Sequence, residues 1–312
     1  MDVEALTAGV LGREARAVAR AISLVEDGRP ELAQLSAGLF PHTGAAATVG
    51  LTGAPGVGKS TLAAGLVRTA RAAERRVAVL AIDPTSPYTG GALLGDRVRM
   101  QEHATDPDVF IRSMATRGHL GGMALAAPEA VRILDAAGYD LVIVETVGVG
   151  QAEIDVAAAT DTALVVLAPG FGDAVQMAKA GILEVADVFV VNKADRDGAV
   201  EVARDLRQML QLGVTRAWDP PVLCTVAGDG TGIDDLWAAI DRHRVHLASS
   251  GDLVGRREAR VYQEVEALAA ERFKLVSAST LTTGDLAARL RDRSIDPYGA
   301  ADELLRRIAP RE

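Results

Sequence analysis

Residues 53–61 have the types and spacing that bind the phosphates of a nucleoside triphosphate. The segment matches the pattern G-x-x-x-x-G-K-[ST] at every fixed position and reads Gly53-Ala54-Pro55-Gly56-Val57-Gly58-Lys59-Ser60-Thr61. Glycines let such a loop turn tightly with its N–H groups pointing inward, where they and the start of the next helix attract phosphate oxygens. Lys59 is predicted to reach the β- and γ-phosphates, and Ser60 to give its hydroxyl to Mg²⁺. An apolar run before the segment and a helix-favouring run after it disfavour the alternative, a chance glycine-rich turn.

A second segment narrows the nucleotide to GTP. Asn192-Lys193-Ala194-Asp195 follows the apolar run 188–191 and has the pattern N-K-x-D, which reads guanine in GTPases. The carboxylate of Asp195 can accept hydrogen bonds from guanine N1–H and from the 2-amino group, and adenine offers no such pair. An unpaired carboxylate would cost several kcal/mol, so discrimination of the order of 10⁴ is expected. The next strand ends near Thr225, Val226 and Ala227, which are predicted to present a backbone N–H to the guanine oxygen.

Carboxylates at strand ends are candidates for the magnesium site. Asp83 follows the apolar run 77–82, and Glu145 follows the run 141–144. Both are predicted to point into the crevice at the carboxyl ends of parallel strands. Mg²⁺ prefers a few carboxylates together with water and phosphate oxygens. Asp96, after a glycine-rich loop, is a third candidate, although a charge at a helix N-terminus explains it equally well.

The residues after Glu145 predict slow hydrolysis. Gly148 can give a backbone N–H to the γ-phosphate and so respond to its loss. Many GTPases place glutamine directly after this glycine to orient the attacking water, whereas this chain has Val149 there and Gln151 later. An apolar side chain cannot position water, so we expect slow turnover unless Gln151, another side chain or a partner protein intervenes. Gln151 is equally compatible with an exposed polar residue.

Short β-rich runs alternate with helical stretches and provide the strand ends. The runs are 47–52, 77–82, 108–112, 141–146, 162–168, 187–192 and 221–225. Several are continuously apolar, which is typical of parallel strands buried on both faces. The alternation predicts a doubly wound, mostly parallel α/β sheet in a nucleotide-binding domain at 46–248. Residues 1–45 are predicted to be a helical extension, and residues 249–312 a strand-free helical segment.

Composition and charge restrict the class of protein. The chain has 312 residues, of which 49% are hydrophobic and 24% charged, so a globular fold is expected. The net charge of −9 argues against nucleic acid as the main partner, and no apolar run approaches the roughly 20 residues of a membrane span. Without a recognisable signal peptide, and with Cys224 as the single cysteine, a cytoplasmic protein is expected. For His243 and His246, a solvated helix face is favoured over a metal site.

Several motifs together resemble the MeaB/ArgK family of GTPases, chaperones of adenosylcobalamin-dependent methylmalonyl-CoA mutase. In chain order they are Gly-Ala-Pro-Gly-Val-Gly-Lys-Ser-Thr, Asp-Pro-Thr-Ser-Pro, Glu-Thr-Val-Gly-Val-Gly-Gln and Asn-Lys-Ala-Asp. The resemblance covers nearly the whole chain. It implies a P-loop NTPase fold of the SIMIBI class and a homodimer formed through the C-terminal helices. It also implies a GTPase, stimulated by the mutase, that assists cobalamin loading, protection and reactivation.

The same resemblance assigns roles to residues. The family's phosphate and magnesium positions correspond to Lys59, Ser60, Asp83, Asp96 and Glu145. The expected catalytic set comprises Lys59, Asp96, Glu145, Gly148 and Gln151. The loop 168–179 matches a mobile loop through which the family communicates with the mutase. Lys179 is the charged residue of that loop to test first. The alternative interpretation is that Lys179 is an ordinary solvated lysine on a helix.

Other functions make different demands on the sequence. A metal-insertion GTPase, as in nickel enzyme maturation, would need a His/Cys cluster near the switch loops, which one cysteine and scattered histidines disfavour. A P-loop kinase or ATPase linked to lysine, arginine and ornithine transport would prefer ATP and transfer phosphate to an acceptor. The guanine pattern that ends in Asp195 disfavours that alternative.

Overall fold

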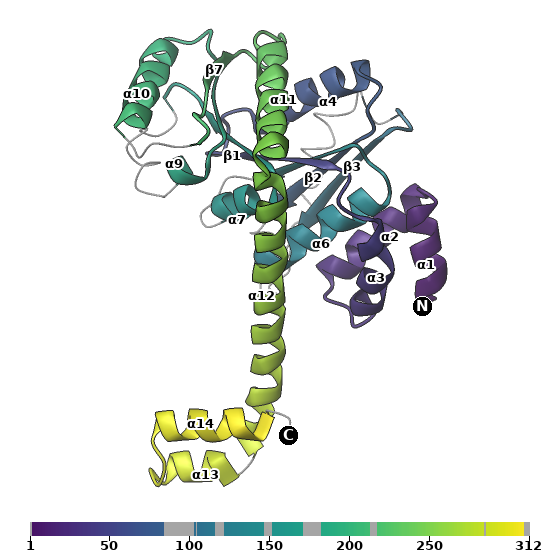
Figure 1. Cartoon of the computed structure of the whole chain (residues 1–312), viewed down its shortest axis with the longest axis vertical. Helices are drawn as coiled ribbons and strands as arrows, with labels where there is room; N and C mark the ends of the chain where they lie inside the picture. The colour runs from purple at the N-terminus through teal and green to yellow at the C-terminus, as the bar shows by residue number, and fades with distance from the viewer. Residues whose placement is uncertain are drawn as a thin grey trace. The chain divides into compact units, whose positions relative to one another are not determined.

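Parallel strands form a seven-stranded sheet in the computed structural model, in the order β3-β2-β4-β1-β5-β6-β7 (Figure 1). The structure describes residues 2–83, 103, 105–115, 122–146, 152–170, 182–212, 217–283 and 285–308. The strands are β1 (Ala47–Thr52), β2 (Val77–Asp83), β3 (Val109–Ala115), β4 (Leu141–Thr146), β5 (Thr162–Leu167), β6 (Val188–Asn192) and β7 (Val222–Thr225). The predicted doubly wound α/β fold is confirmed, and each predicted run corresponds to one of these strands.

The central strands are apolar because helices cover both faces of the sheet. Every residue of β4 and β5 is buried, as expected for parallel strands with both faces covered. Side chains alternate between the faces, so Leu141 and Ile143 of β4 join one apolar cluster and Val142 and Val144 join another. The clusters therefore show which face each residue of a strand occupies.

Helices form one layer on each face (Figure 1). On one face α4 (Lys59–Ala72) and α11 (Ile233–Ser250) pack against each other and the sheet. On the opposite face lie α6 (Gly122–Ala136) and α7 (Ala152–Ala159). α10 (Ala199–Gln211) packs against β6 and β7, and α9 (Ile182–Val185) is a single turn before β6.

The N-terminal helices pack on the face of the sheet that carries α6, and one of them also contacts the edge strand β3. They are α1 (Val3–Leu11), α2 (Ala15–Glu26) and α3 (Leu32–Leu39), followed by the 3₁₀ turn η1 (Phe40–His42). The carboxylate of Glu26 is buried, and it accepts hydrogen bonds from Ala115 N at 3.1 Å and Arg112 Nη2 at 2.6 Å. Glu26 therefore supplies an acceptor to the edge strand at its carboxyl end.

The chain divides into two compact units, Met1–Arg260 and Val261–Glu312. α12 (Asp252–Thr283) contributes residues to both, and α13 (Asp285–Arg291) and α14 (Pro297–Ile308) belong to the second. Within the second unit, Leu286, Ala300 and Leu304 form a small buried cluster. The predicted limits of the nucleotide-binding domain stay a prediction. In the part of the chain that the structure describes, no helix has the length and apolarity needed to cross a membrane.

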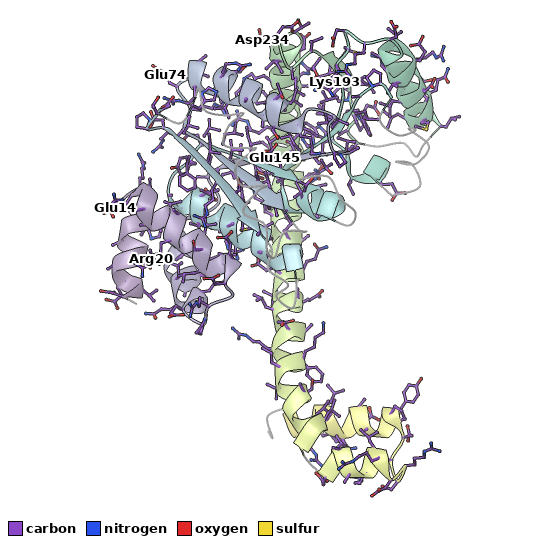
Figure 2. The ribbon with its side chains drawn as sticks, turned by 180° about the vertical axis from the view of Figure 1, so that it is seen from behind. Glu14, Arg20, Glu74, Glu145, Lys193 and Asp234 are labelled. Carbon is purple, nitrogen blue, oxygen red and sulfur yellow. The ribbon has the colours of Figure 1, made fainter. Side chains whose placement is uncertain are left out.

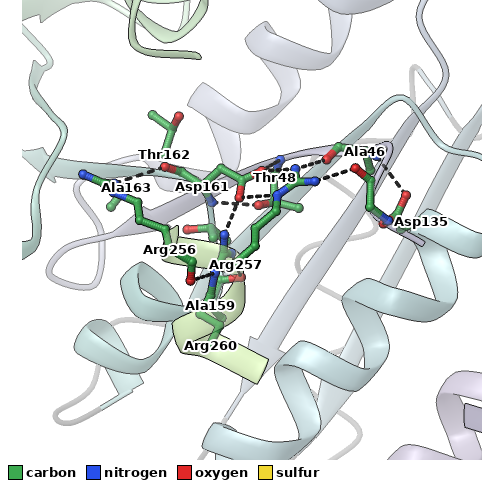
Figure 3. A network of polar contacts seen from close by, with 12 residues as sticks. Ala46, Thr48, Asp135, Ala159, Asp161, Thr162, Ala163, Arg256, Arg257 and Arg260 are labelled. Carbon is green, nitrogen blue, oxygen red and sulfur yellow. Dashed lines mark hydrogen bonds and ion pairs between the residues drawn. The ribbon is translucent and has the colours of Figure 1, made fainter. Parts of the chain in front are cut away.

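Buried aspartates at the amino ends of β5 and β6 hold the start of α12. Asp161 directly precedes β5, and its carboxylate accepts hydrogen bonds from Arg257 Nη2 at 2.6 Å and from Arg260 (Figure 3). Asp187 directly precedes β6 and accepts one from Arg256 Nη1 at 3.1 Å. Burial by itself raises the pKa of Asp161, but the hydrogen bonds and charges of Arg257 and Arg260 outweigh it and bring that pKa below its usual value.

Candidate nucleotide-binding site

The phosphate-loop segment connects β1 to α4 through glycines in unusual conformations. Gly53, Gly56 and Gly58 have φ values of 137°, 80° and 99°, which residues with side chains rarely adopt. A Cβ on Gly53 would lie 2.1 Å from Val166 O, and one on Gly58 would lie 2.4 Å from Asn192 Nδ2. Glycine is therefore required at 53 for contact with β5, and at 58 for contact with the end of β6.

Lys59 lies inside this loop and is only 6% exposed. Its Nζ donates hydrogen bonds to Gly53 O at 2.5 Å and to Ala54 O at 3.0 Å. Because α4 begins at Lys59, the positive end of the helix dipole faces the same space. The helix start and the ammonium group, with the loop N–H groups that the pattern predicts to point inward, form a candidate cradle for an anion. A bound phosphate would take over hydrogen bonds that the ammonium makes to the two carbonyls.

Asn192 joins the segments that the sequence assigns to a single site. It is 2% exposed, and its Nδ2 donates to Val57 O in the phosphate loop at 2.8 Å. Its Oδ1 accepts hydrogen bonds from Thr225 Oγ1 and Ala227 N, both at 3.1 Å. The asparagine amide therefore fixes the phosphate loop to the end of β7, a structural role that the sequence pattern did not predict.

Lys193 and Asp195 lie at the rim of the same site. Lys193 has a φ of 57°, which is uncommon for a residue with a side chain. Its Nζ donates to Gly56 O at 2.6 Å, which adds a second contact with the phosphate loop. Asp195 is exposed, so its carboxylate is accessible to a ligand.

The N–H groups predicted to contact guanine already donate within the protein. Ala227 N donates to Asn192 Oδ1, and Val226 N donates to Thr231 O at 2.9 Å. A contact with the guanine oxygen from either residue would compete with these hydrogen bonds. The guanine role of Thr225, Val226 and Ala227 stays a prediction.

Three of the residues predicted for the magnesium site, Ser60, Asp83 and Glu145, lie at or near the carboxyl edge of the sheet. Glu145 of β4 is 3% exposed and occupies the face covered by α4, as does Ile143 two residues earlier (Figure 2). Ser60 is the second residue of α4 and is half-buried. Asp83 ends β2 in register with Ala115, and its side chain lies outside the description. Carboxylate and hydroxyl oxygens are the hard ligands that Mg²⁺ prefers, so these residues fit a magnesium–nucleotide complex.

Some of the predicted residues lie outside the part of the chain that the structure describes. They are Asp96, Gly148, Gln151 and Lys179, together with Val149. Their predicted roles stay predictions.

His243 is buried, so the expectation of a solvated histidine pair was wrong for this residue. It has 0% exposure, with Nδ1 2.9 Å from Thr162 Oγ1 and Nε2 3.2 Å from Asp187 Oδ1. The ring of Trp218 packs against it at a centroid distance of 4.9 Å. These partners are distant in sequence, so local helix periodicity could not reveal them. Among the described residues, no group of three or more His, Cys, Asp and Glu side chains is arranged to hold a metal.

Ser113 is a buried residue at the same edge of the sheet that sequence reasoning missed. It is 9% exposed and belongs to β3, in register with Ala81 of β2. The predicted strand run 108–112 ended one residue before it. A serine that continues an apolar strand was the available signal, because a buried hydroxyl requires a partner.

Comparisons with known proteins agree with this geometry. A family model described as methylmalonyl-CoA mutase-associated GTPase MeaB matches residues 18–280. A Pyrococcus horikoshii protein whose name places it among GTPases is 48% identical over 301 residues, which is 95% of each chain. The Escherichia coli GTPase ArgK is 41% identical over 263 residues, covering 81% of this chain and 78% of that relative. A solved structure titled as an LAO/AO transport system kinase has a TM-score of 0.70 and 28% identity, covering 98% of this chain and 97% of the other.

The family model spans most of the chain, and the relatives share its fold along nearly the same length. The phosphate-loop pattern and the N-K-x-D pattern, joined in space by Asn192, lie inside the matched region. The chain therefore belongs to the MeaB family of methylmalonyl-CoA mutase-associated GTPases.

Proposed function

We propose that this protein is a magnesium-dependent GTPase that binds an adenosylcobalamin-dependent methylmalonyl-CoA mutase and assists the loading, protection and reactivation of its cobalamin. The junction of Asn192 with the phosphate loop carries the nucleotide part of the proposal, because it places the guanine-reading segment next to the phosphate cradle. The family description, which names the mutase, supports the partner. The cytoplasmic location predicted from the sequence is kept as part of the proposal.

In this proposal the phosphates of GTP lie on the loop from Gly53 to Thr61. When GTP binds, Lys59 gives up hydrogen bonds that it donates to the carbonyls of Gly53 and Ala54 and donates to phosphate oxygens instead. Asp195 accepts the two N–H donors of guanine, and its exposure supports that role. A site that hydrogen-bonds a base in this way strongly rejects a base without the two N–H donors. ATP is therefore a poor substrate.

Ser60 and Glu145, with Asp83 and Asp96, hold the magnesium ion in this proposal. The ion neutralises charge on the β- and γ-phosphates when it is bound. Gly148 contacts the γ-phosphate, and Val149 leaves the attacking water without an adjacent polar side chain. Intrinsic hydrolysis is therefore slow, and Gln151 or a group supplied by the mutase accelerates it.

We further propose that the loop 168–179, with Lys179, communicates with the mutase and that the protein is a homodimer. Support for the dimer comes from the α12 residues beyond Arg260, where several apolar side chains are exposed. They include Val265 at 58%, Leu268 at 41% and Leu275 at 59%. Exposed apolar residues spaced along one helix are typical of helix–helix association.

Nucleotide hydrolysis by the purified protein, with and without a B12-dependent mutase, tests the proposal. We expect GTP to be hydrolysed slowly, ATP to be hydrolysed far more slowly still, and the mutase to raise the GTP rate. Lys179→Ala should lower the ratio of stimulated to intrinsic rate. Equal rates with ATP and GTP would refute the guanine assignment, and a GTP rate that no B12 enzyme changes would refute the partner.

The transport-kinase alternative is separated by the same assay with labelled γ-phosphate. A kinase transfers the label to an acceptor and prefers ATP, whereas a GTPase releases it as inorganic phosphate. The E. coli relative that shares 41% identity is named a GTPase, which favours phosphate release.

A further inference from the structure

The hydroxyl of Ser113 is a buried polar group near the carboxyl edge of the sheet. Its Oγ is inaccessible to solvent and makes no hydrogen bond to any residue that the structure describes. An unsatisfied buried hydroxyl costs about 1–3 kcal/mol, so native proteins usually satisfy such groups with water or a ligand. A partner for this hydroxyl therefore comes from outside the described residues, and a buried water is the simplest such partner.

Strand alternation shows which way this hydroxyl points. Met114 packs in the apolar cluster that includes α6, and Arg112 reaches Glu26 of α2, so residues 112 and 114 occupy the α2/α6 face. Ile111 packs against the cluster that includes α4. Successive side chains of a strand point to opposite faces, so Ser113 shares the α4 face with Ile111. That face carries Lys59 and the start of the phosphate-loop helix.

The sheet register places Ser113 in a row with Glu145. Ala81 of β2 is in register with Ser113 on one side and with Glu145 on the other. Neighbouring strands are about 4.8 Å apart, so the two outer residues are separated by about 10 Å at the backbone. Between them on this face lies the methyl group of Ala81. When the serine and glutamate side chains lean toward each other over that methyl group, one water with hydrogen bonds of about 2.8 Å to each can join them.

The carboxyl end of β3 is also held in place from outside the sheet. Glu26 accepts hydrogen bonds from Ala115 N and from Arg112 Nη2, on either side of Ser113 in the chain. Ala115 is in register with Asp83, another predicted carboxylate of the magnesium site. The N-terminal extension therefore fixes the strand end on which Ser113 stands.

We propose that Ser113 is a positioning residue of the magnesium site. Its hydroxyl holds a water above Ala81, and that water hydrogen-bonds the carboxylate of Glu145 and orients it toward the hydrated ion. This inference rests on the proposed function, since it assigns Glu145 to magnesium. Outer partners of metal-binding carboxylates commonly change metal affinity by 10–100-fold when removed.

The test is the Mg²⁺ dependence of GDP binding, measured by titration calorimetry on the full-length protein. We expect Ser113→Ala to raise the Mg²⁺ concentration for half-maximal binding about tenfold, near the lower end of that range. Binding in the presence of a chelator should stay unchanged, because the phosphate loop is intact. Ser113→Thr keeps the hydroxyl and should retain most of the Mg²⁺ affinity. Adding Ala81→Ser to Ser113→Ala places a new hydroxyl beside Glu145 and should restore part of it.

Ser23→Ala is the matched control, because Ser23 Oγ accepts a hydrogen bond from Arg112 Nη2 at 2.8 Å on the opposite face. Thermal unfolding without nucleotide compares the folding of all variants. The inference would be overturned if Ser113→Ala had the same Mg²⁺ dependence of GDP binding as wild type. It would also be overturned if Ser23→Ala raised the half-maximal Mg²⁺ concentration by as much as Ser113→Ala does. Either result would leave the proposed function standing. Wild-type protein that binds GDP without any Mg²⁺ dependence would overturn the magnesium part of the proposed function and this inference with it.

Discussion

Asp161→Asn should destabilise the first unit by about 3 kcal/mol, because it leaves arginines without their carboxylate. Asp161 is 5% exposed, whereas the side chains of Arg257 and Arg260 are 28% and 19% exposed. Removing one partner of a buried ion pair costs about 3–5 kcal/mol. Partial solvation of both guanidinium groups places this site at the low end of that range. The amide retains the side-chain volume, so the loss reports charge and hydrogen bonding rather than a cavity.

Urea unfolding followed by tryptophan fluorescence measures this effect, because Trp218 and Trp237 both lie in the first unit. A loss of about 3 kcal/mol lowers Tm by about 6–12 °C for a unit of this size. Asp241→Asn is the control: Asp241 pairs with Arg244 at 3.0 Å, and both side chains are nearly half exposed. Exposed pairs contribute about 0–1 kcal/mol. If the two variants lost equal stability, the argument that burial strengthens the Asp161 contacts would be refuted.

Other predictions concern the site and the pH response. Asp195→Asn should weaken GTP binding by about 100-fold or more. It should improve XTP binding, because xanthine carries an oxygen where guanine carries its 2-amino group. Parallel titrations with both nucleotides measure this change. Gly58→Ala should cost about 1–3 kcal/mol through backbone strain and displace Asn192, with weaker GDP binding by calorimetry. Gly255→Ala, where a Cβ meets nothing within 4 Å, should not reduce stability. The pKa of Asp161 is lowered in the folded state, so the stability that its carboxylate contributes is fully present above about pH 4 and is lost as pH falls further. Urea titrations at pH 7 and pH 3 measure this: the difference in free energy of unfolding between wild type and Asp161→Asn should be smaller at pH 3.

The strands and the phosphate loop were predictable because their signals are local. Continuous apolar runs such as 141–144 indicate strands covered on both faces, and the order of runs and helices indicates a parallel sheet. The spacing of Gly53, Gly58 and Lys59 encodes a loop whose conformation depends mainly on its own residues. The positive φ values at those glycines agree with that reasoning.

Contacts between distant segments were not predictable from the same patterns. Asp161 and Arg257 are separated by 96 positions in the chain, and only the folded sheet brings them together. The same applies to His243, which local periodicity assigned to a solvated face although Thr162 and Asp187 enclose it. The N-K-x-D pattern predicts that Asp195 binds guanine, but it gives no information on the hydrogen bonds of Asn192, which depend on the end of β7.

The position of Asn192 has a consequence for ligand fragments. One end of its amide holds the phosphate loop and the other holds the end of β7, so the proposed base and phosphate subsites form one connected block. Guanosine and pyrophosphate are then halves of a bivalent ligand whose subsites are held at a fixed spacing. Joining them in GDP makes the second contact intramolecular, with an effective concentration of about millimolar or above. GDP should therefore bind far more tightly than either fragment alone.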